Sequence, residues 1–147
     1  MKFLYLFVLL LTFSACSTYS DEELLDFDEQ IEYYLSAKDI KCERSESGLY
    51  YKIIDQGEGK EIKYKDLISF KYRGELLNGL VFDEQKEPIE FKLEQLIACW
   101  KEIIIELNVG GKAFIVAPPQ LGYGDHDLQN IPKNSILTFE IKVVGVK

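Results

Sequence analysis

The sequence predicts an α+β domain with an antiparallel sheet, one helix inserted among its strands and another helix before them. Apolar and polar residues alternate as in half-buried strands, most clearly over residues 67–76 and 135–143. Asn78-Gly79, the dipeptide most typical of a tight hairpin, follows the first of these segments. Residues 93–107 instead repeat apolar side chains at helical spacing. Strands that meet in hairpins around one inserted helix favour the antiparallel arrangement.

Residues 1–15 have the pattern of a signal peptide. Lys2 gives a positive start, residues 3–13 are apolar apart from Thr12, and Ser14-Ala15 supplies a small-residue cleavage site. The apolar run is too short for a bilayer-spanning helix, which takes about 20 residues. We expect this segment to be removed on export.

Residues 13–16, Phe-Ser-Ala-Cys, resemble the lipobox of bacterial lipoproteins, although Phe13 replaces the usual Leu, Val or Ile. The resemblance implies that Cys16 becomes the lipid-modified first residue of the mature chain. The protein would then be tethered to a membrane of the cell envelope. The alternative is a simple secretory cleavage site, with Cys16 unmodified.

The chain is acidic, with 25 Asp and Glu against 17 Lys and Arg and a net charge of −8, or −9 once Lys2 is removed. This acidity argues against nucleic acid or an anionic lipid surface as a partner.

Cys42 and Cys99 could pair in an exported protein, but two cysteines make a weak case for a disulfide. Cys99 is expected to be a small buried side chain.

Residues 16–46 are predicted to form an acidic spacer followed by a helix. Ser20 and Glu23 have the spacing of a capping box, which begins a helix. Apolar side chains then recur at helical spacing at Leu24, Phe27, Ile31, Tyr34 and Leu35.

The later chain reads as strands separated by turn residues, before and after the inserted helix. The predicted strands are residues 49–54, 67–76, 80–82, 112–117 and 135–143, with residues 89–93 leading from Pro88 into the helix and a long loop over residues 118–133.

The inserted helix, predicted over residues 93–107, is strongly amphipathic and carries the single tryptophan, Trp100, at the centre of its apolar face. Its β-branched residues 103–105 form helix poorly alone, so the helix needs a surface to pack against. The apolar face comprises Leu93, Leu96, Ile97, Trp100, Ile103, Ile104 and Leu107.

Ordinary catalytic chemistry is hard to find in the sequence. The lone histidine, His126, lies in a Gly- and Asp-rich loop without a serine or cysteine partner at a recognisable spacing. No Cys/His pattern predicts a metal, and Gly110-Gly111 follows a helix as a cap rather than a phosphate loop. We expect no metal and no cofactor.

Six segments, in order along residues 47–147, resemble the FKBP-type peptidyl-prolyl cis-trans isomerases. They are Phe70-Lys71-Tyr72-Arg73-Gly74, Val81-Phe82-Asp83, Phe91 with Leu96-Ile97 and Trp100, Val109-Gly110-Gly111-Lys112, residues 117–124 and residues 131–140. The resemblance implies a sheet wrapped around one short central helix, with a shallow apolar pocket.

The resemblance also implies a role for each pocket residue. Trp100 would form the floor, and Tyr123 and the Ile97 N–H would hold substrate carbonyls. The remaining pocket residues would be the walls Tyr72, Phe82, Phe91 and Phe139, the rim at Leu96 and Ile97, the polar edge at Asp83, and the substrate contacts Ile89 and Ile131. The chain departs from the family pattern at Ile89, Cys99, Asn130 and Lys133.

The implied activity is isomerisation of X-Pro bonds in exported proteins by a monomer that acts on proline-containing polypeptides. One alternative is a binding module that engages proline segments with little or no turnover, as a chaperone or assembly factor of the envelope. A third interpretation is a non-catalytic fold whose acidic helix docks to an envelope complex. The leader and anchor also resemble FKBP lipoproteins of gliding-motility systems.

Overall fold

The structure, a computed structural model, describes residues 18–147. The predicted signal peptide, residues 1–15, and the predicted lipidation site at Cys16 therefore lie outside the described residues. Within residues 18–147, no helix is both long and apolar enough to cross a membrane.

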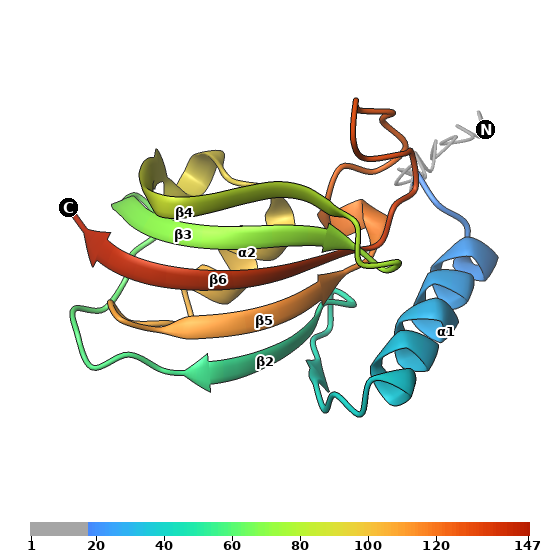
Figure 1. The fold of residues 1–147 in the computed structure, drawn as a ribbon, viewed down its shortest axis with the longest axis horizontal. Helices are drawn as coiled ribbons and strands as arrows, with labels where there is room; N and C mark the ends of the chain where they lie inside the picture. Colours follow the sequence, from blue (N-terminus) through green and yellow to red (C-terminus); the bar gives the residue numbers. More distant parts are fainter. Residues whose placement is uncertain (1–17) are drawn as a thin grey trace, which may run out of the picture.

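Six strands form one antiparallel sheet with the order β1-β2-β5-β6-β3-β4 (Figure 1), which confirms the predicted fold class. The strands are β1 (Glu43–Arg44), β2 (Tyr50–Asp55), β3 (Leu67–Leu76), β4 (Val81–Lys92), β5 (Lys112–Ala117) and β6 (Leu137–Val146). The helices are α1 (Asp21–Ala37) and α2 (Ala98–Ile104), with short 3₁₀ turns η1 (Leu93–Gln95) and η2 (Pro119–Leu121).

The predicted hairpin at Asn78-Gly79 joins β3 to β4. The Leu76 N–H donates to the Leu80 carbonyl at 2.9 Å, and Gly79 has a φ of 84°, which a glycine adopts without strain. Strand β4 continues through Pro88 to Lys92 and is much longer than the predicted residues 80–82. Proline is tolerated there because β4 is an edge strand, where a missing N–H removes no ladder bond.

The single helix predicted over residues 93–107 is wrong in extent. The chain makes the 3₁₀ turn η1, becomes extended at Leu96 and Ile97 with ψ values of 163° and 158°, and only then forms the seven-residue α2. Leu93 and Trp100 are nevertheless both buried. The apolar spacing correctly predicted that these two side chains face the core. It did not show that they belong to two elements, η1 and α2, with different hydrogen bonding.

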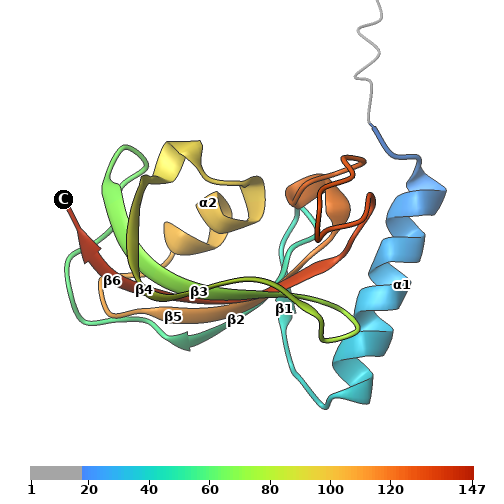
Figure 2. The same ribbon diagram turned by 45° about the horizontal axis from the view of Figure 1, so that its top comes forward.

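Helix α2 lies against one face of the curved sheet (Figure 2), and the main hydrophobic core fills the space between them. Cys99 is fully buried there, as predicted, and burial raises the pKa of its thiol. Cys42 and Cys99 are both free thiols, so the structure does not pair them.

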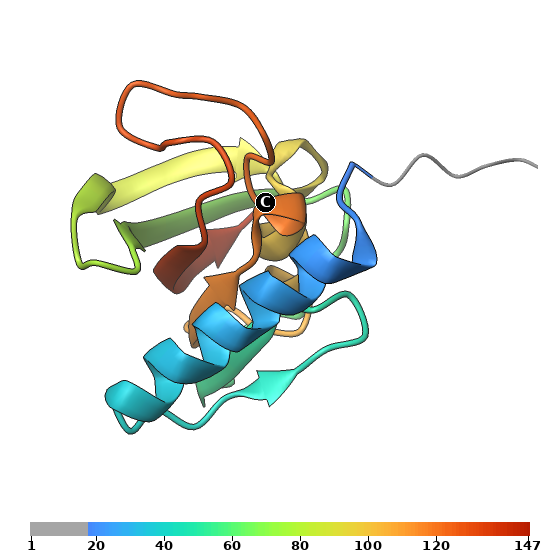
Figure 3. The same cartoon turned by 90° about the vertical axis from the view of Figure 1, so that its right-hand side faces the viewer.

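Helix α1 begins with the predicted capping box. The Ser20 N–H donates to Glu23 Oε2 at 2.8 Å, and the Glu23 N–H donates to Ser20 Oγ at 3.3 Å. The Ser20 N–H and the Ser20 hydroxyl, which donates to Glu23 Oε2 at 2.9 Å, both lower the pKa of the Glu23 carboxyl. The helix lies across one end of the sheet (Figure 3), where an ion pair of 2.6 Å between Arg44 and Asp28 joins it to β1.

A second, smaller hydrophobic cluster holds α1 against the sheet. Its helix face consists of Phe27, Ile31 and Leu35, which pack with Val116 of β5 and other buried side chains. The helix is therefore part of the folded domain and not a separate arm.

We predict that Ile31→Ala lowers the free energy of unfolding by about 2–5 kcal/mol, because it truncates a fully buried side chain. Urea unfolding followed by circular dichroism measures the change. Tyr33→Ala, on the exposed face of the same helix, is the control and should change stability by less than about 0.5 kcal/mol. Equal effects of the two variants would show that α1 is not anchored through this cluster.

Candidate functional site

Trp100 of α2 lies at the centre of an aromatic cluster. Its ring centroid is 4.7 Å from that of Tyr72, 5.3 Å from Phe70 and 5.1 Å from Phe139, in edge-on arrangements with interplanar angles of 64°, 87° and 84°. Edge-to-face pairs match the positive edge of one ring to the negative face of another. The helix is thus held by rings from β3 and β6, two neighbouring strands of the sheet.

Gly74 allows this cluster to close. A Cβ at position 74 would lie 2.6 Å from Phe82 Cζ and 2.9 Å from Phe139 Cε1. The two phenylalanine rings themselves meet edge-on at 5.6 Å. The glycine therefore gives the rings of β4 and β6 room to meet over the backbone of β3.

A pocket of about 210 Å³ opens beside Trp100. Most of the residues predicted to contact substrate line it: Tyr72, Ile89, Phe91, Leu96, Ile97, Trp100 and Tyr123. The extended pair Leu96-Ile97, which interrupts the predicted helix, forms part of this wall. The structure thus brings together residues from β3, β4, α2 and the loop after β5.

The other four predicted site residues do not line this pocket. Phe139 is 1% exposed and lies beneath Trp100, and Phe82 packs edge-on against Phe139. Ile131 is buried in the loop before β6, where it forms a bridge with Leu128. Asp83 accepts a hydrogen bond from the Tyr72 hydroxyl and so fixes the orientation of that wall.

The Tyr123 hydroxyl and the Ile97 N–H are hydrogen-bond donors at the pocket, and neither has an acceptor within the described residues. Ile97 caps α2, and its carbonyl accepts from Trp100 and Lys101 at 3.1 Å. Its own N–H precedes the helix and stays unused. The arrangement suits a ligand that brings carbonyl oxygens to an apolar surface.

The phenols of the pocket remain protonated at neutral pH. Burial raises the pKa of Tyr72, and the hydrogen bond to Asp83 raises it further. Burial is also the main cause that raises the pKa of Tyr123, with Asp83 nearby as a smaller cause. Both groups therefore act as neutral donors, not as acids or bases.

The indole Nε1 of Trp100 is the one buried side-chain nitrogen or oxygen in residues 18–147 without a hydrogen-bond partner. Aromatic rings surround it, and the face of a ring is a weak acceptor for an N–H group.

Phe70 and Gln95 also line the pocket, although neither was predicted as a site residue. The alternation of β3 places Phe70 on the same face as Tyr72, so the sequence could have indicated it. Gln95 lies in η1, and no sequence pattern distinguishes it.

His126 is exposed, with a 78% exposed side chain, and the described residues contain no cluster of His, Cys, Asp and Glu able to hold a metal.

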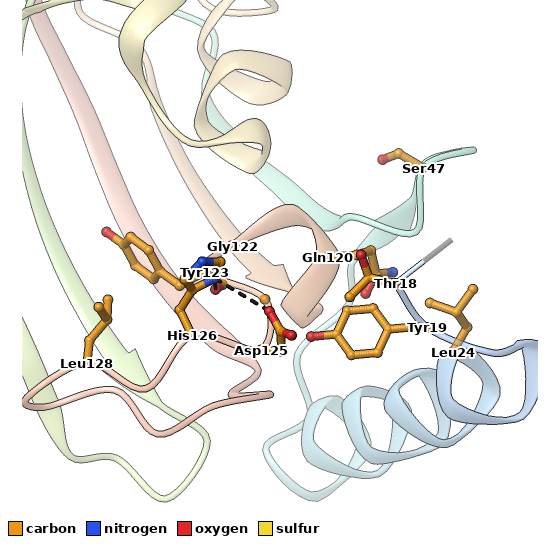
Figure 4. A pocket seen from close by; sticks show the side chains of 11 residues that line it. Thr18, Tyr19, Leu24, Ser47, Gln120, Gly122, Tyr123, Asp125, His126 and Leu128 are labelled. Atoms are coloured by element: carbon orange, nitrogen blue, oxygen red, sulfur yellow. Dashed lines mark hydrogen bonds and ion pairs between the residues drawn. The ribbon is translucent and has the colours of Figure 1, made fainter. Parts of the chain in front are cut away.

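A larger pocket of about 790 Å³ lies between the start of α1 and the loop after η2 (Figure 4). Its lining includes Tyr123, which it shares with the pocket beside Trp100. The two pockets are therefore neighbours that share one lining residue.

Comparisons with known proteins agree with this geometry. Residues 58–144 match the family model described as FKBP-type peptidyl-prolyl cis-trans isomerase. A probable FKBP-type peptidyl-prolyl cis-trans isomerase of Haemophilus influenzae is 41% identical over 117 residues, which are 77% of this chain and 48% of that protein. FkpA of Escherichia coli is 35% identical over 114 residues, which are 76% of this chain and 42% of that protein.

Solved structures of FKBP-type proteins also resemble this chain. The crystal structure of FkpA from Escherichia coli superposes with a TM-score of 0.74 and 32% identity over 86% of this chain and 62% of that chain. AtFKBP13 superposes with a TM-score of 0.66 and 31% identity over 73% of this chain and 99% of that chain. The chain spans less than half the length of the curated relatives named above.

We predict that Gly74→Ala destabilises the domain by about 1–3 kcal/mol, because the added methyl group overpacks the Phe82 and Phe139 rings. Urea unfolding gives the stability, and near-ultraviolet circular dichroism reports the aromatic packing. Gly145→Ala is the matched control on β6, where the new Cβ would meet its nearest neighbour at 3.5 Å. If both variants unfold at the same urea concentration, the close approach at Gly74 does not limit packing.

Proposed function

Because the chain belongs to the FKBP-type peptidyl-prolyl cis-trans isomerase family, we propose that it accelerates the rotation of X-Pro bonds in exported polypeptides. The observation that carries this proposal is the apolar pocket beside Trp100, with the two unpaired donors at Tyr123 and Ile97 on its wall. An X-Pro segment has an apolar ring and carbonyl oxygens. The apolar walls can contact the ring, and the two donors can bind the carbonyl oxygens.

The proposed chemistry needs no proton transfer. Rotation about the amide bond crosses a barrier of about 18–20 kcal/mol, because the twisted state loses resonance across the C–N bond. The twisted amide is also less polar at its carbonyl than the planar amide. A pocket that replaces water with aromatic and aliphatic walls therefore favours the twisted state over either planar isomer.

The donors have a separate role in this proposal. The Tyr123 hydroxyl and the Ile97 N–H take no part in proton transfer. Each can donate a hydrogen bond to a substrate carbonyl. These bonds would fix the chain on both sides of the rotating bond. The floor of Trp100 would hold the proline ring while the rest of the peptide turns.

A second function remains open at the same pocket. Ile89 lines the wall where the family usually has an aromatic residue, so that wall is smaller. Binding of proline segments with little acceleration would make the protein a chaperone or assembly module of the envelope. The activity measurement below separates the two functions.

We further propose that the mature protein is a monomer tethered to a membrane of the cell envelope through lipid on Cys16. The sequence pattern of residues 13–16 and the apolar run before it support this anchor. A role in gliding motility stays a prediction from the resemblance of the leader and anchor.

The proposed activity predicts that protein expressed from the full chain accelerates cis/trans exchange in a short X-Pro peptide, measured by exchange NMR. Tyr123→Phe should lower kcat/KM by about 2- to 10-fold, the loss expected for one hydrogen bond. Trp100→Leu should lower it by about tenfold, because the flat aromatic floor is removed while most of the volume is kept. Tyr72→Ala and Phe82→Ala should also lower the rate.

Tyr33→Phe is the matched control, since this exposed phenol of α1 lies outside the pocket beside Trp100. It should leave the rate unchanged. A folded wild-type protein that binds the peptide without accelerating exchange would contradict the isomerase proposal and support the binding module.

Lipidation predicts that Cys16 is acylated and that the protein fractionates with membranes in its native cells. Mass spectrometry of the amino-terminal peptide measures the modification. Cys16→Ala should release the protein into the soluble fraction, whereas Cys42→Ser, the control, should not. An unmodified amino terminus would rule out the anchor.

A further inference from the structure

The larger pocket, which we call the α1 groove, is a preformed surface next to the proposed isomerase pocket. It is lined by Thr18, Tyr19, Leu24, Ser47, Gln120, Gly122, Tyr123, Gly124, Asp125, His126 and Leu128. Figure 4 shows Tyr19 and Asp125 facing each other near its centre, with Leu24 on one side and Leu128 on the other.

The groove is built by the start of the N-terminal helix and the residues just before it, and not by the family domain alone. Thr18, Tyr19 and Leu24 precede residue 58, where the match to the family model begins. The opposite wall belongs to the loop between η2 and β6. The helix thus adds a surface to one edge of the isomerase pocket.

Specific contacts fix the two walls relative to each other. Tyr19 is 6% exposed, its hydroxyl donates to Asn134 Oδ1 at 2.9 Å, and its ring meets Phe27 edge-on at 5.3 Å. The Asn134 N–H in turn donates to the Gly124 carbonyl at 2.8 Å. The groove therefore exists before any ligand binds.

The charge of the groove is negative. The Asp125 side chain is 63% exposed, and its contact with His126 Nδ1, at 3.6 Å, is an ion pair only when the histidine is protonated. The first turn of α1 adds Asp21, Glu22 and Glu23 at the same end of the molecule. Among the described residues that line the groove there is no lysine or arginine.

The apolar walls and the acidic centre suit a peptide segment that carries a cation. Leu24 and Leu128, the latter 42% exposed, offer apolar contacts on either side of Asp125. A lysine or arginine side chain matches this arrangement, because its aliphatic stem packs on apolar surface while its charged head meets a carboxylate.

Resting on the proposed function, we propose that the α1 groove is a second substrate subsite, which takes a basic residue near the isomerised proline. The two pockets share Tyr123, so one polypeptide occupies both without leaving the surface. An extended chain advances about 3.3 Å per residue, so the position at which a basic residue acts measures the distance from the proline to the groove. The preferred substrates are therefore basic, proline-containing segments.

The test uses protein expressed from the full chain and a 12-residue peptide with one X-Pro bond. Lysine is placed in turn at each of the four positions on either side of the proline, and matched peptides carry glutamine or glutamate there. Exchange NMR gives kcat/KM for each peptide. We expect lysine to raise kcat/KM about 3- to 5-fold over glutamine at positions on one side, the size of one partly exposed ion pair.

Asp125→Asn should abolish the preference for lysine, while Asp127→Asn should keep it. Both variants remove one exposed carboxylate from the same loop, but only Asp125 lines the groove. Neither should change kcat/KM for an uncharged X-Pro tetrapeptide, which brings no cation to Asp125. An equal lysine preference in both variants would show that the general acidity of the chain causes it, and would overturn the subsite.

Failure of the subsite and failure of the proposed function give different results. If the tetrapeptide is accelerated but lysine has no effect at any position, the subsite is wrong and the isomerase stands. If no peptide is accelerated, the isomerase is wrong, and chemical-shift changes on binding the lysine peptide still decide the subsite. Changes at Thr18, Leu24 and Leu128 that disappear in Asp125→Asn support it, and changes elsewhere alone overturn it.

Discussion

Three aromatic rings pack edge-on around Trp100 and hold α2 against the sheet. Helix α2 has only seven residues and no side-chain cap at its start, and such a helix is marginal without tertiary contacts. Phe70 and Tyr72 hold it from β3, and Phe139 holds it from β6. The same contacts that fix the helix also present one wall of the pocket.

This packing links the shape of the sheet to the shape of the site. Gly74 removes a side chain where Phe82 and Phe139 must meet, and the edge strand β4 carries Ile89 and Phe91 to the other side of Trp100. The break between η1 and α2 then turns Leu96 and Ile97 toward the opening. A pocket of this kind follows from the fold itself, because most of its walls also pack against the core.

The polar groups of the molecule divide into those that are used internally and those left for a ligand. The Tyr72 hydroxyl is bonded to Asp83, and the Tyr19 hydroxyl is bonded to Asn134, so both serve the architecture. Tyr123 and the Ile97 N–H keep unused donors, and Asp125 keeps an exposed carboxylate. Together they suggest a continuous path for a polypeptide from the apolar pocket to the acidic groove.

Four features could be predicted before the fold was known: the α+β class, the Asn78-Gly79 hairpin, the capping box of Ser20 and Glu23, and the buried position of Cys99. These features depend on residues close together in the chain, because the spacing of apolar side chains and the residue types at turns favour particular local structures. The folded structure breaks the helix at Leu96, because packing against the sheet, not local propensity, sets hydrogen bonding there. It also decided that Phe139 lies beneath Trp100 and that Tyr19 meets Asn134, 115 residues away, since no local pattern records contacts between distant residues.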